Sequence, residues 1–471
     1  MHKGGIAMKA TAKQNTELIL HGDLKKAVLS LAVPIVINNF LQTMYNLTDA
    51  YWLKWIGTDS QAAISLVSPV QNIVVNFGQG ITLAGAILIS QYVGSRDRKN
   101  AVDMANHIFM FSMVFSVCLA LLGFFSADAI VAWLKAEGNV AHFGGIYLKI
   151  VLLDLPFLFM INIFSAVRQA QGDTVGPVRL NLLGIILNMI LDPLLMIGLK
   201  MGITGAALAT LAAKVPCALI GYIRLVSKRG DDIGIDPIHF KFDPEKLKKV
   251  LRIGLPTAIG SSTMQFGFLL MTKNVLEFGD NAMAAYGIAN RVNGLVSMPS
   301  NAVGSAVATI VGQNAGAGNM RRAEQAYKKA RSMIVIFLFI SGMILSRGIV
   351  STGVVRIFSE DPAVIPMAAD FLSIMAFWVW TNGIHNTTTG LLQGTGNTLY
   401  TMVNDAARLW VFRFATLFIF KNCFDMHERS VWYSVVVSNA ISAFILWVLY
   451  RAGVWKNVIG REKHTAAEAA Q

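Results

Sequence analysis

Apolar stretches nearly as long as a bilayer is thick constrain this chain more than any other feature of its sequence. The stretch LLGIILNMILDPLLMIGL occupies residues 182–199, and SMIVIFLFISGMIL occupies residues 332–345. A helix needs about 20 mostly apolar residues to cross a bilayer. Of the 471 residues, 54% are hydrophobic and only 14% are charged, whereas about a quarter of a soluble domain is charged. The sequence therefore predicts an all-α integral membrane protein.

Hydropathy and charge together predict twelve transmembrane helices. Basic stretches follow the second, sixth and eighth spans: RDRK, KRGDD with KFDPEKLKK, and RRAEQAYKKAR. Because basic loops stay on the cytoplasmic side, both termini are expected in the cytoplasm, and the net charge of +13 is assigned to membrane flanks and not to nucleic-acid binding. The N-terminal segment is polar and does not resemble a signal peptide, and we expect a multi-pass protein of a bacterial inner (plasma) membrane. The predicted spans are 27–56, 62–90, 104–126, 143–166, 177–198, 203–225, 248–277, 283–311, 328–350, 365–392, 398–421 and 431–451.

The two halves of the sequence repeat each other at one offset, 256 − 34 = 222 residues. Matching Pro, Gly and Gln residues at a single offset indicate a duplication. Each half holds six spans, an even number, so the halves are parallel repeats related by an axis along the membrane normal. The matched pairs include Pro34 and Pro256, Gly57 and Gly279, Gln91 and Gln313, Gly94 and Gly316, and Gln171-Gly172 and Gln393-Gly394. The predicted parts are a cytoplasmic tail 1–22, an N-lobe 23–225, a cytoplasmic linker 226–247, a C-lobe 248–455 and a cytoplasmic tail 456–471.

Three carboxylates fall inside predicted spans of the N-lobe, where each costs at least about 2.5 kcal/mol to insert. Asp49 continues a polar stripe that begins with Gln42 and Tyr45, since residues at i, i+3 and i+7 share a helix face. Asp154 lies next to Pro156 and is equally consistent with a hydrogen-bonded structural residue. Asp192 follows Asn188 by four residues, so these two side chains also share a face.

Four of these polar residues are expected at one depth in the membrane. With a rise of about 1.5 Å per residue, each lies roughly 10 Å inside the outer end of its span. Carboxylate, amide and hydroxyl oxygens are hard ligands that suit Na⁺, or a shared proton if one carboxylate holds it. The predicted coupling site consists of Asp49, Asn188, Asp192 and Thr210.

Prolines in the first and fifth spans predict hinges. Pro34 and Pro193 each lack the N–H that would bond to the carbonyl four residues earlier, which permits a bend. The C-lobe lacks matching acids, because Met271 stands where the offset places Asp49. There, Asp405 with Arg408 is interpreted as a neutral structural pair, and His385 as a buried core histidine. Three separated cysteines predict neither a disulfide framework nor a zinc site, and no cofactor is expected.

Two further classes of protein compete with a transporter. A flippase of lipid-linked intermediates would need cations for pyrophosphate, and Arg168, Arg179 and Arg291 are candidates. An intramembrane aspartyl protease needs two membrane aspartates, but the contexts NLTDAY and NMILDP do not contain the required GxGD-type motif, and no HExxH, GxSxG or P-loop motif is present. We therefore expect a protein that is not an enzyme.

Several motifs resemble those of the multidrug and toxic compound extrusion (MATE) transporters. GQNAGAG at 312–318 and QGTGNT at 393–398 are similar to motifs of the family, and YNLTDAYWLKWIG and NMILDP resemble its DinF-like branch. The resemblance covers residues 23–455. It implies two six-helix bundles around a V-shaped central cavity and export of amphiphilic, often cationic, compounds in exchange for Na⁺ or H⁺.

The resemblance also implies roles for individual residues. The cation site of the branch matches the four residues already selected by depth, and the family's first-span proline matches Pro34. The implied partners are small-molecule substrates and membrane lipids, and the implied state is a monomer. The residues expected to line the substrate cavity are Gln42, Tyr45, Tyr147 and Asp154, the last on its burial alone.

Overall fold

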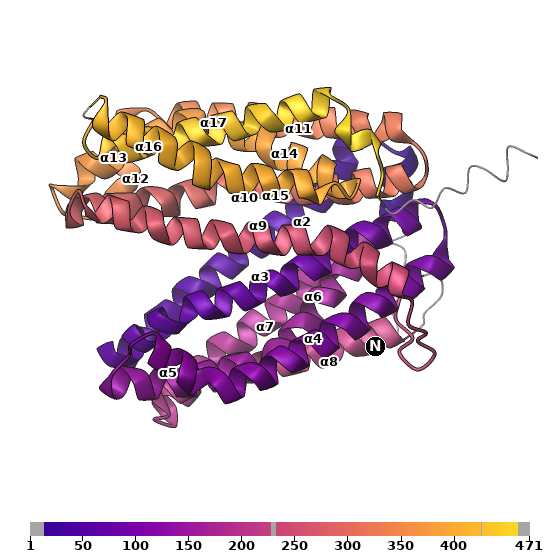
Figure 1. Ribbon diagram of the computed structural model, residues 1–471, viewed down its shortest axis with the longest axis horizontal. Coiled ribbons are helices and arrows are strands. Elements are labelled where there is room, and N and C mark those ends of the chain that lie inside the picture. The colour runs from indigo at the N-terminus through magenta and orange to yellow at the C-terminus, as the bar shows by residue number, and fades with distance from the viewer. Residues whose placement is uncertain (1–13, 228–231, 425, 460–471) are drawn as a thin grey trace, which may run out of the picture. The chain divides into compact units, whose positions relative to one another are not determined.

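The computed structural model describes residues 14–227, 232–424 and 426–459, and this part of the chain is helical and contains no strand (Figure 1). A short helix over residues 14–21 comes first. The helices of the first half are α2 (Leu24–Leu53), η1 (Lys54–Ile56), α3 (Thr58–Gly94), α4 (Arg98–Trp133), α5 (Gly138–Leu153), α6 (Leu155–Ala170), α7 (Val175–Pro193), η2 (Leu194–Gly198) and α8 (Gly202–Val226). Those of the second half are α9 (Pro244–Leu276), α10 (Asp280–Gly316), α11 (Met320–Leu345), α12 (Gly348–Val355), α13 (Val364–Trp378), α14 (Trp380–Gly394), α15 (Thr398–Ala406), η3 (Ala407–Arg413), α16 (Phe414–Asn422), α17 (Arg429–Arg451) and η4 (Val454–Lys456).

The helices match the predicted spans one by one. Seven helices of the described chain are long and apolar enough to cross a membrane, and counting three bent pairs as single spans raises this number to ten. The other two predicted spans correspond to α9, whose first turns carry lysines, and to the series α15, η3 and α16, which is divided by a π-helical segment. The prediction of an all-α membrane protein is confirmed.

Three spans that the sequence predicts as single helices are broken. The chain bends by 40° between α5 and α6, by 83° between α11 and α12, and by 50° between α13 and α14. The first break lies at Asp154, two residues before Pro156 in the first turn of α6, where a proline ring cannot continue the preceding helix. The second lies directly before Gly348, a residue type that is unfavourable inside helices.

The duplication is visible in the backbone. Helices α3 and α10 begin and end at the same offset of 222 residues, since 280 − 58 and 316 − 94 both equal 222. Each is preceded by a glycine with positive φ, Gly57 at 88° and Gly279 at 96°. Each is followed by a helix, α4 or α11, whose N-terminus is capped by a side chain, and the two capping residues are also 222 positions apart. Asp97 accepts a hydrogen bond from Asn100 N–H, and Asn319 does so from Arg322 N–H.

The offset grows to 224 residues before the turns that follow α6 and α14. In these turns the positive-φ glycines are Gly172 and Gly396, and 396 − 172 = 224. Gly172 N–H donates to Gln169 O, and Gly396 N–H donates to Gln393 O, both at 2.8 Å. The sequence pairing of Gln171-Gly172 with Gln393-Gly394 is therefore wrong by two residues, because the second half contains a two-residue insertion before this turn.

Packing divides the chain into two compact units. Helix α2 changes units at Pro34, and α9 changes units two residues after the matching Pro256, so each of these helices belongs partly to both. Packing thus assigns residues 23–33 and 248–258 differently from the predicted lobes. Unit 1 comprises Met1–Glu17 and Pro34–Ala258, and unit 2 comprises Leu18–Val33 and Ile259–Gln471.

Small residues bring helices close together within each unit. In unit 1, a Cβ on Gly80 of α3 would lie 2.6 Å from Gly254 O of α9. In unit 2, a Cβ on Gly390 of α14 would lie 2.2 Å from Gly304 O of α10. Such close backbone approach is typical of helix packing in membranes, where dispersion contacts replace the hydrophobic effect between helices.

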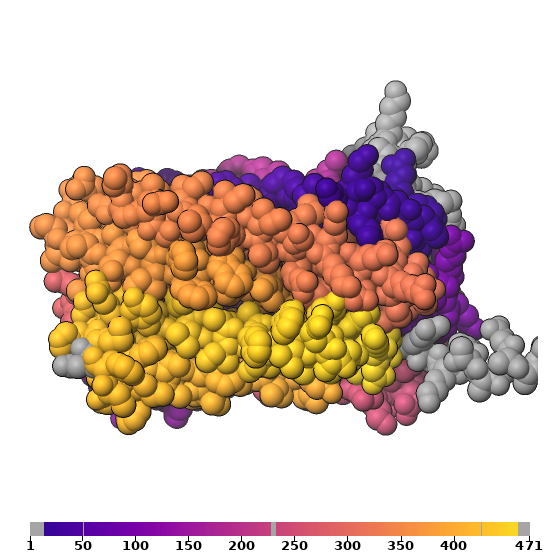
Figure 2. Space-filling model, turned by 90° about the horizontal axis from the view of Figure 1, so that it is seen from above, coloured from indigo at the N-terminus to yellow at the C-terminus, as the bar shows by residue number. Residues whose placement is uncertain are grey.

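The outer helices of unit 2 present apolar side chains outward. Figure 2 shows this unit, with α17 (yellow) running along the visible face. Phe444 and Trp447 of α17 are exposed, as are Ile336 and Phe337 of α11. The buried side contains a stack of Tyr286, Phe371 and Trp432, in which the rings of the last two are 4.1 Å apart. An exposed apolar face over a packed aromatic core fits a helix bundle in lipid.

Candidate functional site

Asp192 is the second-last residue of α7 and the more deeply buried of the two acids of the predicted coupling site. Its residue is 1% exposed, and neither carboxylate oxygen has a hydrogen-bond donor among the described residues. Pro193 follows it as the last residue of α7, and the π-helical segment η2 takes the place of a further α-helical turn. Because Pro193 cannot donate to the carbonyl of Met189, the local hydrogen bonding changes register at this point, as π-bulges at functional sites often do.

Asn188 and Thr210 join α7 to α8 beside this carboxylate. Asn188 Nδ2 lies 3.5 Å from Thr210 Oγ1, and the Thr210 hydroxyl donates to Ala206 O at 3.2 Å. Asn188 is 3% exposed, and its Oδ1 also has no donor among the described residues. Three buried acceptor oxygens, one from Asn188 and two from Asp192, thus have no donor in hydrogen-bonding geometry, although the Asn188 amide lies near enough to interact with the Asp192 carboxylate. Buried polar atoms in proteins are nearly always paired, so this concentration requires an explanation.

Asp49 of α2 lies close enough to Asp192 for the two charges to interact. The Asp49 residue is half-buried. Among the described residues, neither carboxylate has a basic side chain within ion-pairing distance. Tyr45, one turn before Asp49, is within hydrogen-bonding range of Thr210. Four of the predicted side chains from three spans therefore gather around Asn188 in unit 1.

Tyr147 of α5 lies within electrostatic reach of Asp49, Asp154 and Asp192. It is half-buried, and a phenol in this position can donate a hydrogen bond to a carboxylate. Gln42 does not join the group. Its side chain is exposed and lies 3.5 Å from Asn46 on its own helix.

Asp154 has a partner that the sequence reasoning did not identify. It is 1% exposed and accepts a hydrogen bond of 2.5 Å from Lys214 Nζ of α8. Lys214 ends the stretch AALATLAAK, one turn beyond Thr210 on the same helix, so the only signal in the sequence was its position in a span. A second missed link joins α2 to α7, where Asn181 Nδ2 donates to Asn38 Oδ1 at 2.9 Å.

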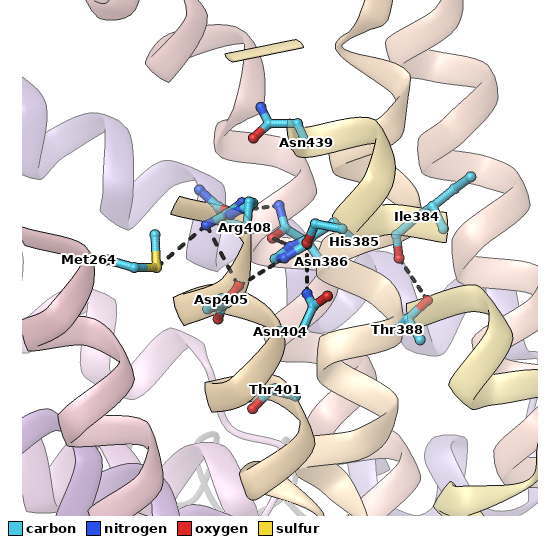
Figure 3. Close-up of polar contacts among 12 residues, drawn as sticks. Met264, Ile384, His385, Asn386, Thr388, Thr401, Asn404, Asp405, Arg408 and Asn439 are labelled. Carbon is cyan, nitrogen blue, oxygen red and sulfur yellow. Dashed lines mark hydrogen bonds and ion pairs between the residues drawn. The ribbon is translucent and has the colours of Figure 1, made fainter. Parts of the chain in front are cut away.

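A second polar cluster lies in unit 2 (Figure 3). Asp405 Oδ1 is 3.0 Å from His385 Nε2 and 3.6 Å from Arg408. Arg408 also approaches the Met264 sulfur at 3.4 Å. Arg413, four percent exposed, donates to Ser438 and Asn439 of α17. Asp405 is thus shared by two bases from different helices, and is not simply paired with Arg408 on its own span.

The site formed by Asp49, Asn188, Asp192 and Thr210 has too few acidic side chains to bind a metal ion by carboxylates alone, so amide and hydroxyl oxygens would have to complete the ligand set. No group of three or more His, Cys, Asp or Glu side chains that could hold a metal lies within the described ranges. The gathered set instead combines two carboxylates with amide, hydroxyl and phenol oxygens. This chemistry fits Na⁺, which takes oxygen ligands of either charge, or a proton shared between the carboxylates.

The duplicated fold is recognised twice by one family model. The MatE model matches residues 34–194 and again residues 256–419, which together make up more than half of the chain. The chain belongs to the MatE family. Both matches start at the prolines that the repeat pairs, Pro34 and Pro256. MatE proteins are membrane transporters and not enzymes, so the aspartyl protease alternative is wrong.

Other MatE proteins resemble the chain over nearly its whole length. The probable multidrug resistance protein YpnP of Bacillus subtilis is 24% identical over 92% of this chain and 96% of its own. The probable multidrug resistance protein NorM of Thermotoga maritima is 25% identical over 94% of this chain and 96% of its own. A solved structure described as an outward-facing conformation of a multidrug resistance MATE family transporter of the MOP superfamily is 25% identical. It aligns with a TM-score of 0.87 and covers 93% of this chain and 98% of its own.

One cation considered for a flippase of this fold is neutralised. Arg168 is 6% exposed and pairs with Asp173 at 2.8 Å and with Asp232 at 3.1 Å. Asp232 belongs to the predicted linker, of which residues 228–231 lie outside the described ranges. A guanidinium with two carboxylate partners is not available to bind pyrophosphate without breaking these pairs.

Proposed function

We propose that this MatE transporter is a cation-coupled antiporter of the inner membrane that exports amphiphilic, often cationic, organic compounds. The names of its relatives as multidrug resistance proteins support the substrate class. The exchanged cation is H⁺ or Na⁺, it binds in the N-lobe, and both termini are cytoplasmic. The protein acts as a monomer, with membrane lipids as its surroundings.

One observation carries the proposal. Three buried acceptor oxygens of Asn188 and Asp192 have no donor among the described residues, and Asp49 lies beside them. Two carboxylates without a cation inside a membrane are mutually repulsive and strongly desolvated. Binding of one proton or Na⁺ lowers the net charge of the pair from −2 to −1, which relieves the repulsion and reduces the desolvation cost. The cation therefore changes the stability of whichever conformation brings these groups together.

The proposed cycle uses that change in stability. A cation enters from outside and binds between Asp49 and Asp192, which removes their mutual repulsion. Helix α2 then bends at Pro34 while α7 adjusts at Pro193, which releases substrate outward. A proton moving down one pH unit supplies about 1.4 kcal/mol. A potential of 100 mV adds about 2.3 kcal/mol per charge. Together these sustain a several-hundred-fold accumulation of an electroneutral substrate.

The test is efflux of a fluorescent cationic dye from lipid vesicles that contain the purified protein. A pH gradient and a Na⁺ gradient are imposed in separate experiments at equal membrane potential. We expect one gradient to drive efflux in the wild type, and the variants Asp49→Asn and Asp192→Asn to reduce driven efflux to the level of empty vesicles. Asp280→Asn is the matched control, because Asp280 is an exposed acid at the start of α10.

Each outcome decides between specific alternatives. Efflux driven by only one gradient identifies the coupling ion. Undiminished driven efflux in Asp49→Asn and Asp192→Asn would exclude the N-lobe carboxylates as the coupling site. Absence of driven efflux in the wild type under both gradients would exclude a cation-coupled exporter of such dyes.

A further inference from the structure

Two spans of unit 2 meet at the ring of His385, and a third is joined to its neighbour Asn386 (Figure 3). This residue of α14 is 6% exposed, and its Nε2 is 3.0 Å from Asp405 Oδ1 of α15. Asp405 Oδ1 is also 3.6 Å from Arg408 of η3. A carboxylate held beside a guanidinium is ionised and can only accept hydrogen bonds, so His385 Nε2 must carry a hydrogen.

The other ring nitrogen also faces an acceptor. His385 Nδ1 is 3.3 Å from Asn386 Oδ1. The orientation of this amide is set by α10, because Asn386 Nδ2 donates to Ser300 Oγ at 3.0 Å and to Asn301 Oδ1 at 2.7 Å. In this orientation both hydrogens of the Asn386 amide are directed at α10, and its oxygen faces the ring. The Asn386 oxygen therefore remains directed at the ring, where it can accept a hydrogen bond but cannot donate one.

Only one form of the ring satisfies both contacts. Neutral imidazole has a single N–H, whereas imidazolium has two. A second buried histidine in the same chain shows the opposite arrangement. His107 Nδ1 faces Asp103 O at 2.8 Å, and its Nε2 accepts a hydrogen bond from Asp243 N–H at 2.8 Å. One donor and one acceptor fit a neutral ring, so the surroundings of His107 and His385 select different protonation states.

We propose that His385, Asp405 and Asn386 form a proton-binding site in unit 2. The site goes beyond the proposed function, whose coupling site lies in unit 1. When the proton is bound, the imidazolium holds the Asn386 oxygen and leaves the amide nitrogen to Ser300 and Asn301. When Nδ1 loses its hydrogen, its lone pair faces the Asn386 oxygen, and the amide must turn away. The proton therefore controls the side-chain link between α14 and α10.

The surrounding charged and titratable groups do not take over this role. Arg408 keeps Asp405 ionised, and Arg413 is occupied by neutral partners on α17. On α11, Tyr327 and Arg331 interact with each other, and the Tyr327 hydroxyl contacts Thr388 of α14, one turn beyond His385. On α10, Tyr286 lies near Arg413. Among the described residues, the ring nitrogens of His385 contact Asp405 and Asn386 and none of these other groups.

Nitrogen NMR of the histidine rings tests the proposal directly. Full-length protein with ¹⁵N-labelled histidine is placed in lipid nanodiscs at pH 7, and the two buried residues are assigned with the variants His385→Gln and His107→Asn. We expect both ring nitrogens of His385 to be protonated, and one nitrogen of His107 to lack a proton. An unprotonated ring nitrogen at His385 under these conditions would overturn the proposal.

A second pair of variants tests the role of the amide. Asn386→Leu removes the acceptor at Nδ1, and we expect His385 to lose its imidazolium signal. Asn290→Leu is the matched control, because the Asn290 amide interacts with Tyr286 of its own helix and forms no hydrogen bond with His385 in the described part of the chain, so the signal should persist. Persistence of the imidazolium in Asn386→Leu would remove Asn386 from the site. If His385→Gln does not fold, His385→Asn provides the assignment.

The proposed proton site and the proposed transport function are tested by independent experiments. The NMR measurement needs no substrate or gradient, so absence of driven efflux in vesicles does not affect it. Conversely, a neutral His385 would leave the efflux experiments on Asp49 and Asp192 as they stand.

Discussion

The Asp154 carboxylate accepts a hydrogen bond of 2.5 Å from the Lys214 ammonium, and this bond ties the break between α5 and α6 to α8. Asp154 is 1% exposed, as is Asp192, yet only Asp154 has a basic partner. Two acids of equal burial thus have different surroundings within one unit. The charge of Asp154 is balanced by Lys214, whereas Asp192 has no basic partner among the described residues.

Removing one partner of this ion pair should destabilise the protein. Lys214→Met leaves a buried carboxylate alone, which typically costs about 3–5 kcal/mol. Replacing both partners with apolar residues, Asp154→Leu with Lys214→Met, should restore much of the loss. Thermal unfolding in detergent measures both effects. A double variant less stable than Lys214→Met would show that Asp154 has a role besides this pair.

The Thr210 hydroxyl should matter for cation binding more than for folding. Thr210→Val keeps the volume of the side chain and removes the oxygen near Asn188 Nδ2 and Tyr45. Loss of one buried polar contact costs about 1–3 kcal/mol, so we expect roughly a tenfold or greater decrease in apparent affinity for the coupling cation. The measurement is the cation concentration that gives half-maximal dye efflux. Thr43→Val, which loses only a bond to its own helix, is the control.

The contact between α10 and α14 should not tolerate a methyl group. A Cβ at Gly390 would lie 2.2 Å from the Gly304 carbonyl oxygen, which cannot move without shifting the helix. Overpacking of this kind costs about 1–3 kcal/mol, and Gly390→Ala should lower the unfolding temperature. Gly287→Ala in α10 meets no atom within 4 Å. It should be neutral or stabilising, because alanine favours helix more than glycine does.

Asp23 should make the stability of the N-terminus of α2 depend on pH. The Lys26 backbone N–H donates to its carboxylate at 2.9 Å, and this bond lowers the pKa of Asp23 below 3.8. A lowered pKa stabilises the folded state above the ordinary value, and the contribution is lost as pH falls through the folded-state pKa. Wild type should therefore lose stability relative to Asp23→Asn on acidification below about pH 4. Parallel pH curves for the two proteins would contradict the assignment.

Most of the fold could be predicted because it follows from local patterns. Apolar length places the spans, and the duplication is recorded in glycines and caps that each require a particular backbone, such as Gly57 and Gly279. The breaks within spans were not predicted. A break depends on which neighbours satisfy the freed backbone groups, and at Asp154 it is accompanied by an ion pair to a residue 60 positions away.

The candidate site was predictable to the extent that depth in a membrane follows from helix rise. Asp192 and Thr210 could be assigned to one level without coordinates, because each lies a known number of residues from a span end. Rotation about the helix axis is not given by depth, and Gln42, although at a suitable depth, contacts only Asn46 of its own helix among the described hydrogen-bond partners. The contact of His385 with Asp405 joins two spans whose relative rotation no local pattern records.

The division of α2 and α9 between the compact units has a consequence for synthesis on the ribosome. Residues 18–33 are synthesised early but pack with segments that begin at Ile259. They therefore cannot reach their packing partners until unit 1 has been translated. Unit 1 in turn is incomplete until Ala258 has been added. The nascent protein therefore cannot finish one bundle before starting the other, and separately expressed halves cut in the linker would each lack a helix segment that the other carries.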